Sequence, residues 1–163
     1  MNDKELKKSW LSESGLSSKV KIKQIKAKDE KLKYIQICDS AYTISVLKRN
    51  DFSELFEKIH QNAIFLGLEY NSEQAGYVAF YANDIEKKIA FITLICMSTK
   101  FQRLHLGSAL MERCIQISKE LNMEQIKLEV LLRDTVAIGF YKKHGFIQDS
   151  VASETRIYMK KKL

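Results

Sequence analysis

Residues 101–110 read Phe101-Gln-Arg-Leu-His-Leu-Gly-Ser-Ala-Leu110. They directly follow an apolar run at Ile89–Met97, and they open an amphipathic helical pattern that lasts to Leu121. The first turn of a helix has unpaired backbone N–H groups and a partial positive charge, so a helix that starts after a buried strand can hold phosphate groups. The pattern therefore predicts a strand, a polar turn and a helix whose beginning binds an anion.

Outward from this segment, apolar periodicity and turn residues predict the other elements. The expected strands are 20–25, 63–70, 74–82, 88–97 and 126–131, with a closing hairpin of 146–148 and 157–160, and the expected helices are 29–47 and 52–59. Asp134 can cap a further helix, which Gly145 ends. The strand–helix–strand passage makes strands 88–97 and 126–131 parallel, whereas the strands before it form an antiparallel meander. The fold class is mixed α/β (α+β).

The length of 163 residues suits one folded domain. We expect a short helix at Asp3–Ser12 and a linker within residues 1–19, followed by a single domain at 20–163. No apolar stretch approaches the roughly 20 residues that span a bilayer, and the N-terminus lacks the apolar core of a signal peptide. A cytoplasmic protein without a membrane partner is therefore expected.

The cysteines and histidines do not predict a metal site. Cys38, Cys96 and Cys114 form no CxxC pair, and the three histidines lack the spacing of metal ligands. Core thiols are the simpler interpretation of the cysteines.

The net charge of +7 is unevenly distributed, because residues 1–33 hold ten lysines against five acidic residues. The stripe of aromatic and basic residues that is typical of a single-strand binder is missing, so no nucleic-acid partner is expected. A lysine-rich solvated surface, or a field that attracts an anionic cofactor or substrate, explains the charge better.

Two motifs resemble those of the GNAT superfamily of acetyl-CoA-dependent N-acetyltransferases. The cofactor motif of that family, Q/R-x-x-G-x-G/A, is similar to Gln102–Gly107. The second motif, N-x-x-A-I-x-x-Y-x-x-x-G-F, is similar to residues 134–146, with Tyr141 at the tyrosine. The resemblance extends over roughly residues 20–162, and the order of the elements agrees throughout.

The resemblance implies a GNAT-like, mainly antiparallel central sheet with splayed parallel fourth and fifth strands and helices on both faces. It also implies acetyl-CoA as co-substrate. Backbone N–H groups near Arg103–Ser108 would hold the pyrophosphate, the strand edge at Ile95–Met97 would pair with the pantetheine amides, and an N–H near Met97 would stabilise the oxyanion. The cofactor-binding residues expected on this basis are Ile95, Cys96, Met97, Gln102, Arg103, Leu104, His105, Leu106, Gly107, Ser108, Asp134, Ala137, Phe140 and Tyr141.

Three residues depart from the family pattern. His105 replaces the first glycine of the cofactor motif, Asp134 replaces the asparagine of the second motif, and Thr99 stands where a proline is often found. A glycine lets the backbone approach a pyrophosphate without a Cβ. His105 could be tolerated, could donate a hydrogen bond to a phosphate, or could weaken cofactor binding.

Tyr141 is the expected general acid, because a phenol with an ordinary pKa of about 10 is protonated at neutral pH and can protonate the departing thiolate. Glu129 and Glu69 are possible bases for the attacking amine, although each can equally be a surface carboxylate. Phe91 stands where some protein-lysine acetyltransferases of the family have a glutamate base, which argues against a histone-type acceptor.

The predicted function is transfer of an acetyl group from acetyl-CoA to a primary amine by direct attack. The acceptor is expected to be a small molecule such as an amino sugar, because Phe80–Asp84 and Leu128–Val130 resemble bacterial members linked to amino-sugar pathways. The alternatives are acetylation of a protein N-terminus or lysine, and a module that binds CoA without catalysis. Either a monomer or a homodimer is compatible with the sequence.

Overall fold

The computed structural model describes residues 19–163. The expected helix at Asp3–Ser12 therefore lies outside the described residues. The strands are β1 Val20–Gln24, β2 Ile64–Tyr70, β3 Glu73–Tyr81, β4 Ile89–Met97, β5 Gln125–Leu131, β6 Ile147–Ser153 and β7 Arg156–Lys162. The helices are α2 Lys28–Cys38, α3 Phe52–Asn62, α4 Leu106–Glu120 and α5 Thr135–Lys143, with 3-10 turns η1 Asp39–Ala41 and η2 Thr99–Phe101.

The strands form one sheet in the order β1-β2-β3-β4-β5-β7-β6. All neighbours are antiparallel except β4 and β5, which are parallel, as the strand–helix–strand passage predicts. The expected mixed fold is therefore confirmed. Between residues 19 and 163, no helix is both long enough and apolar enough to cross a membrane.

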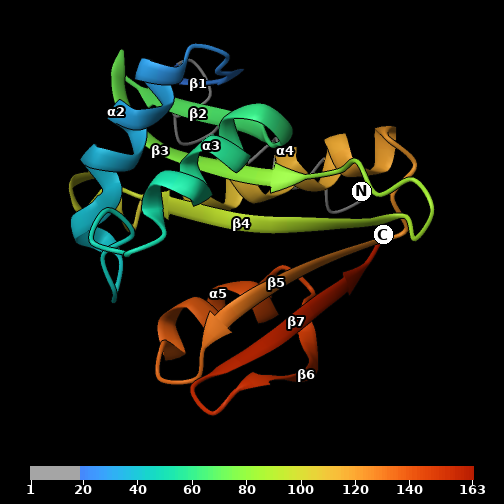
Figure 1. Ribbon diagram of the computed structural model, residues 1–163. Coiled ribbons are helices and arrows are strands. Elements are labelled where there is room, and N and C mark those ends of the chain that lie inside the picture. Colours follow the sequence, from blue (N-terminus) through green and yellow to red (C-terminus); the bar gives the residue numbers. More distant parts are fainter. Residues whose placement is uncertain (1–18) are drawn as a thin grey trace.

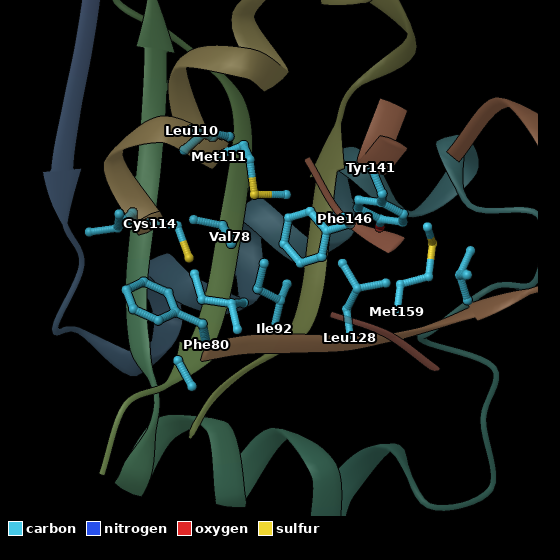
Figure 2. Packing of buried hydrophobic residues seen from close by; sticks show 14 of the residues in the cluster. Val78, Phe80, Ile92, Leu110, Met111, Cys114, Leu128, Tyr141, Phe146 and Met159 are labelled. Atoms are coloured by element: carbon cyan, nitrogen blue, oxygen red, sulfur yellow. The ribbon is translucent and has the colours of Figure 1, made fainter. Parts of the chain in front are cut away.

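Helices cover both faces of the first half of the sheet (Figure 1). On one face, α4 and α5 pack on a core that includes Val78, Leu110 and Phe146. Figure 2 shows that this core continues from α4 and β3 to Phe146 and Met159 of the C-terminal half. On the other face, α2 and α3 cover a second core around Tyr34, Phe65 and Tyr77, to which no described residue of β5, β6 or β7 belongs.

The parallel strands β4 and β5 pair over a short distance only. Their register begins at Ile89 opposite Gln125 and ends at Ile92 opposite Leu128, so both strands continue beyond the last pair. Figure 1 shows β5, β7 and β6 diverging from β4 past this point. The splayed fourth and fifth strands that the family resemblance implies are therefore present.

A β-bulge lies in β4 where the two strands separate. Ala79 pairs with Leu94 and Phe80 pairs with Ile92, which leaves Thr93 as the extra residue. Before the bulge Ile92 packs in the α4 core, whereas after it Ile95 does, so the alternation of faces shifts by one residue. The bulge thus determines which β4 side chains face each side of the gap.

The helix expected at 29–47 is shorter than predicted, because it ends at Cys38. The carboxylate of Asp39 accepts backbone N–H bonds from Val46 at 2.8 Å and Leu47 at 3.1 Å, and a further hydrogen bond from the Ser45 hydroxyl. An aspartate that bonds nearby backbone in this way competes with the helix. Residues 42–51 are therefore a loop built around Asp39, and not a continuation of α2.

Gly67 on β2 provides a test of the second core. A Cβ atom at this position would lie 2.5 Å from Cζ of the buried Tyr34 ring. We expect Gly67→Ala to lower the free energy of unfolding by about 1–3 kcal/mol, because a rigid ring must move. Chemical denaturation would measure this change.

Gly139 provides the matched control, because a Cβ there has no neighbour within 4 Å and the residue lies inside helix α5. Gly139→Ala should stabilise the protein by about 0.5–1 kcal/mol. Equal stability of the wild type and Gly67→Ala would contradict the packing of Tyr34 over β2.

Candidate active site

A cleft of about 910 Å³ lies between the diverging ends of β4 and β5. Its walls come from both strands, the beginning of α4, one side of α5 and the loop after η1. The sequence-predicted residues that line it are Ile95, Cys96, Met97, Gln102, Arg103, His105, Leu106, Gly107, Ser108, Asp134, Ala137, Phe140 and Tyr141. Leu104 does not line the cleft and packs against the α4 core instead.

The edge of β4 presents backbone groups to the gap. The N–H of Ser98 donates to the carbonyl oxygen of Ala75 on β3 at 2.8 Å. Because backbone groups alternate along a strand, those of Met97 and Ile95 point to the opposite side, toward the cleft. The carbonyl of Met97 accepts a hydrogen bond from Nε2 of Gln102 at 3.3 Å, which agrees with this direction. This edge can pair with an extended ligand.

Helix α4 begins at the cleft without a side-chain cap. Its N-cap residue, His105, makes no capping hydrogen bond, and the first turn contains no acidic residue. Helix α5 differs, because Oδ1 of Asp134 accepts the N–H of Ala137 at 3.1 Å. The first N–H groups of α4 are therefore suited to an anion from outside the chain.

His105 has a left-handed backbone, with φ of 59° and ψ of 17°. Arg103 also has a positive φ, of 65°. Glycine adopts this region without steric cost, while other residues do so at a cost of about 1–2 kcal/mol, although histidine is found there more often than most. The family motif has a glycine where the backbone must be left-handed, and His105 adopts the same conformation at a cost in conformational free energy.

Gly107 leaves room above the β4 edge. A Cβ atom there would lie 3.5 Å from Cγ of Met97 and 3.6 Å from Cε2 of Phe140, both ordinary contacts. Alanine would fit, but a larger side chain would enter the space between these residues. Beside it, Oγ of Ser108 lies 3.0 Å from Nε2 of His144, which links the beginning of α4 to the end of α5.

Tyr141 is buried on α5 and lines the cleft. Its ring packs against Phe140 at 5.6 Å and against Phe146 at 5.9 Å between centroids. Burial raises the pKa of the phenol, and the charges of Asp134 and Cys96 raise it further. The hydroxyl is therefore protonated at neutral and mildly alkaline pH.

Asp134 joins two parts of the site. While Oδ1 caps α5, Oδ2 accepts a hydrogen bond from the Thr43 hydroxyl at 3.3 Å. Thr43 belongs to the loop that Asp39 organises. Asp134 serves here as an N-cap, a position at which aspartate and asparagine are equally favoured, so the departure from the family asparagine preserves the cap.

The two candidate bases lie in different places. Glu129 lines the cleft, and its Oε1 lies 3.4 Å from Nε of Arg156. Glu69 lies on β2 beside the edge strand β1 and pairs with Lys23 at 3.1 Å. Glu69 does not line the cleft, so Glu129 is the candidate that the structure brings to the site.

Several lining residues belong to neither motif, namely Tyr42, Thr43, Arg49 and Arg156. The hydroxyl of Tyr42 lies 2.7 Å from that of Tyr77, and burial raises the pKa of both phenols. No motif could have identified these residues. The alternation of buried residues on β7 would have placed Arg156 on the same face as Glu129, but Arg49 depends on the loop.

Comparison with known proteins gives consistent results. A model of the acetyltransferase (GNAT) family matches residues 32–146. A Bacillus subtilis (strain 168) protein, named as a candidate ribosomal protein bS18-alanine N-acetyltransferase, is 29% identical over 106 residues, which are 65% of this chain and 67% of that protein.

Solved structures share the fold. The PaiA N-acetyltransferase of Thermoplasma acidophilum, in complex with coenzyme A, superposes with a TM-score of 0.68 and 16% identity over 88% of this chain and 99% of that chain. The ribosomal-protein-S18-alanine N-acetyltransferase of Escherichia coli has a TM-score of 0.69 and 19% identity over 88% and 93%.

The beginning of α4 can be tested by calorimetric titration with acetyl-CoA. We expect a dissociation constant on the order of 1 μM or below, and His105→Gly should bind at least as tightly because glycine removes the cost of the positive φ. His105→Val should lower the free energy of unfolding by about 1 kcal/mol and weaken binding, because a β-branched residue disfavours this backbone. The absence of detectable binding to the wild type would overturn the anion site at α4.

Proposed function

Since this chain belongs to the GNAT family of acetyltransferases, we propose that it transfers the acetyl group of acetyl-CoA to a primary amine by direct attack. The observation that supports this most is the early separation of β4 from β5, with Tyr141 buried at the gap. An exposed strand edge, an uncapped helix start and a protonated phenol meet there in one cleft.

The chain contributes two binding elements for the acetyl donor, which supplies the reactive thioester. Backbone N–H groups of the first turn of α4 hold the pyrophosphate, and Ser108 and Gly107 belong to this turn. The edge formed by Ile95 and Met97 accepts the pantetheine amides like an added strand. A backbone N–H near Met97 then stabilises the oxyanion.

The reaction forms one bond and breaks another. The amine nitrogen bonds to the acetyl carbon, the C–S bond breaks, and Tyr141 donates its proton to the departing thiolate. The raised pKa of Tyr141 keeps this proton available over the whole neutral range. Glu129 takes the proton that the amine loses, either directly or through a water molecule.

A small-molecule amine is the acceptor that we favour. The acceptor side of the cleft is lined by Glu129, Arg49 and Arg156, which are charged groups suited to a compact polar molecule. A protein N-terminus is the second candidate, because a B. subtilis relative and an E. coli structural neighbour are named for acetylation of a ribosomal protein alanine.

Release of free thiol from acetyl-CoA, measured with a panel of amines, tests the function. Turnover with an amine supports the proposal, whereas binding of acetyl-CoA without turnover of any small amine or N-terminal peptide would indicate a binding module.

Tyr141→Phe should lower kcat by about tenfold or more with little change in acetyl-CoA affinity, because only proton donation is lost. Tyr34→Phe is the matched control, since its buried hydroxyl has no hydrogen-bond partner in the described part of the chain and lies outside the cleft.

The role of Glu129 can be tested in the same assay. Glu129→Gln should lower kcat by about tenfold or more while acetyl-CoA binding persists, because general bases typically contribute at least that much. Glu69→Gln should retain the wild-type rate, because Glu69 lies on β2 next to the edge strand β1 and does not line the cleft. An unchanged rate of Glu129→Gln would remove it as the base.

A further inference from the structure

The face of β5 and β7 opposite α4 and α5 forms the acceptor side of the cleft. Residues 126, 128 and 130 of β5 and residues 157 and 159 of β7 are buried in the α4 core. Side chains alternate along a strand, so Glu129 and Arg156 point to the opposite face. No described residue of these strands takes part in the core beneath α2 and α3. This face is therefore left open to a ligand.

Arg156 forms an ion pair with Glu129 but keeps N–H donors that this pair does not occupy. The register pairs Leu131 with Arg156 and Glu129 with Tyr158, which makes Glu129 and Arg156 diagonal neighbours on one face. Their ion pair joins Nε of Arg156 to Oε1 of Glu129 at 3.4 Å. The two terminal nitrogens of the guanidinium lie beyond this contact and remain as donors at the cleft.

Arg49 approaches the same place from the other wall. Asp51 holds its guanidinium through Nε at 2.8 Å and Nη2 at 2.7 Å, which leaves the Nη1 edge of the fork for another acceptor. The backbone of Arg49 is fixed by hydrogen bonds of its N–H to Val46 and of its carbonyl to Phe52. Arg49 lines the same cleft as Glu129 and Arg156.

Two lysines of this face share one carboxylate away from the cleft. Lys127 and Lys160 both pair with Asp149, at 3.2 and 2.9 Å. Neither lysine lines the cleft. Arg49 and Arg156 are also paired, with Asp51 and Glu129, but both line the cleft and keep N–H donors beyond these pairs. Together with Glu129 they form a pattern complementary to a molecule with one amine and one anionic group.

We infer that the acceptor amine also bears a carboxylate or phosphate group, and that Arg49 and Arg156 hold this group while Glu129 faces the amine. This inference rests on the proposed function. Planar guanidinium groups bind both kinds of anion through paired hydrogen bonds. A linear diamine would place a second positive charge against two arginines, so it should be a poor acceptor.

Matched acceptors would test the inference. The carboxylate pair is 4-aminobutanoate and 4-aminobutanamide, the phosphate pair is O-phosphoethanolamine and ethanolamine, and 1,4-diaminobutane is the diamine. We expect kcat/KM to be at least about tenfold higher for the anionic member of one pair, because hydrogen bonds to charged groups are among the stronger ones in proteins. The pair with the larger ratio identifies the anion.

Substitutions of the two arginines distinguish recognition of the anionic group from a general loss of folding. Arg49→Gln and Arg156→Gln should each reduce the ratio of anionic to neutral kcat/KM by about tenfold, mainly through KM, while the dissociation constant of acetyl-CoA stays within about twofold. Arg113→Gln is the matched control, because Arg113 is exposed on α4 and its substitution removes the same charge outside the cleft. It should leave the ratio unchanged.

Three results would overturn the inference. The first is a kcat/KM for both neutral acceptors that equals or exceeds that of their anionic partners. The second is a ratio of anionic to neutral kcat/KM that Arg113→Gln lowers as much as Arg49→Gln and Arg156→Gln do. The third is a loss of acetyl-CoA binding in Arg49→Gln and Arg156→Gln. If no amine is acetylated, the proposed function fails; calorimetry of the same acceptor pairs with the CoA-saturated protein then decides the inference separately. Preferential binding of an anionic member, lost in Arg49→Gln or Arg156→Gln, would support it, and equal binding of both members would refute it.

Discussion

The separation of β4 from β5 after Ile92 and Leu128 is the constraint on which the rest of the site depends. Strand edges inside a protein normally pair, because an unpaired buried backbone group costs free energy. Here the α4 core continues across both halves of the sheet and holds them together while the edge of β4 stays unpaired. The missing backbone partners of β4 can then be supplied by a ligand.

Three local features adapt this gap to its use. The bulge at Thr93 shifts the side-chain alternation of β4, the uncapped start of α4 faces the gap, and Asp134 caps α5 so that Tyr141 lies at its wall. The left-handed backbone of His105 shows that the turn before α4 has the same shape that a glycine would favour. His105 therefore changes the conformational free energy of this turn and the surface at the beginning of α4, but it does not change the backbone conformation of the turn.

The sequence was sufficient to predict most of the fold and one side of the cleft. Periodicity and the two motifs identified β4, α4, β5 and α5, because these elements are defined by local residue patterns. The wall formed by the 42–51 loop, β5 and Arg156 could not be predicted in this way. The loop at 42–51 arises from a single carboxylate, Asp39, which ends α2 and gathers the backbone of Val46 and Leu47. Arg49 and Arg156 line one cleft only because that loop and the β5–β7 register bring distant parts of the chain to it.

The hydrogen bond between Thr43 and Asp134 is a second connection, or closure, across the gap between β4 and β5. Backbone pairing joins the two halves of the sheet at Ile89–Ile92, and this side-chain contact joins the 42–51 loop to the beginning of α5 across the far end. The two closures differ greatly in strength, since several ladder bonds form the first and one exposed bond of about 1 kcal/mol forms the second. Loss of the second contact would therefore cost little free energy and would leave the pairing of β4 with β5 intact.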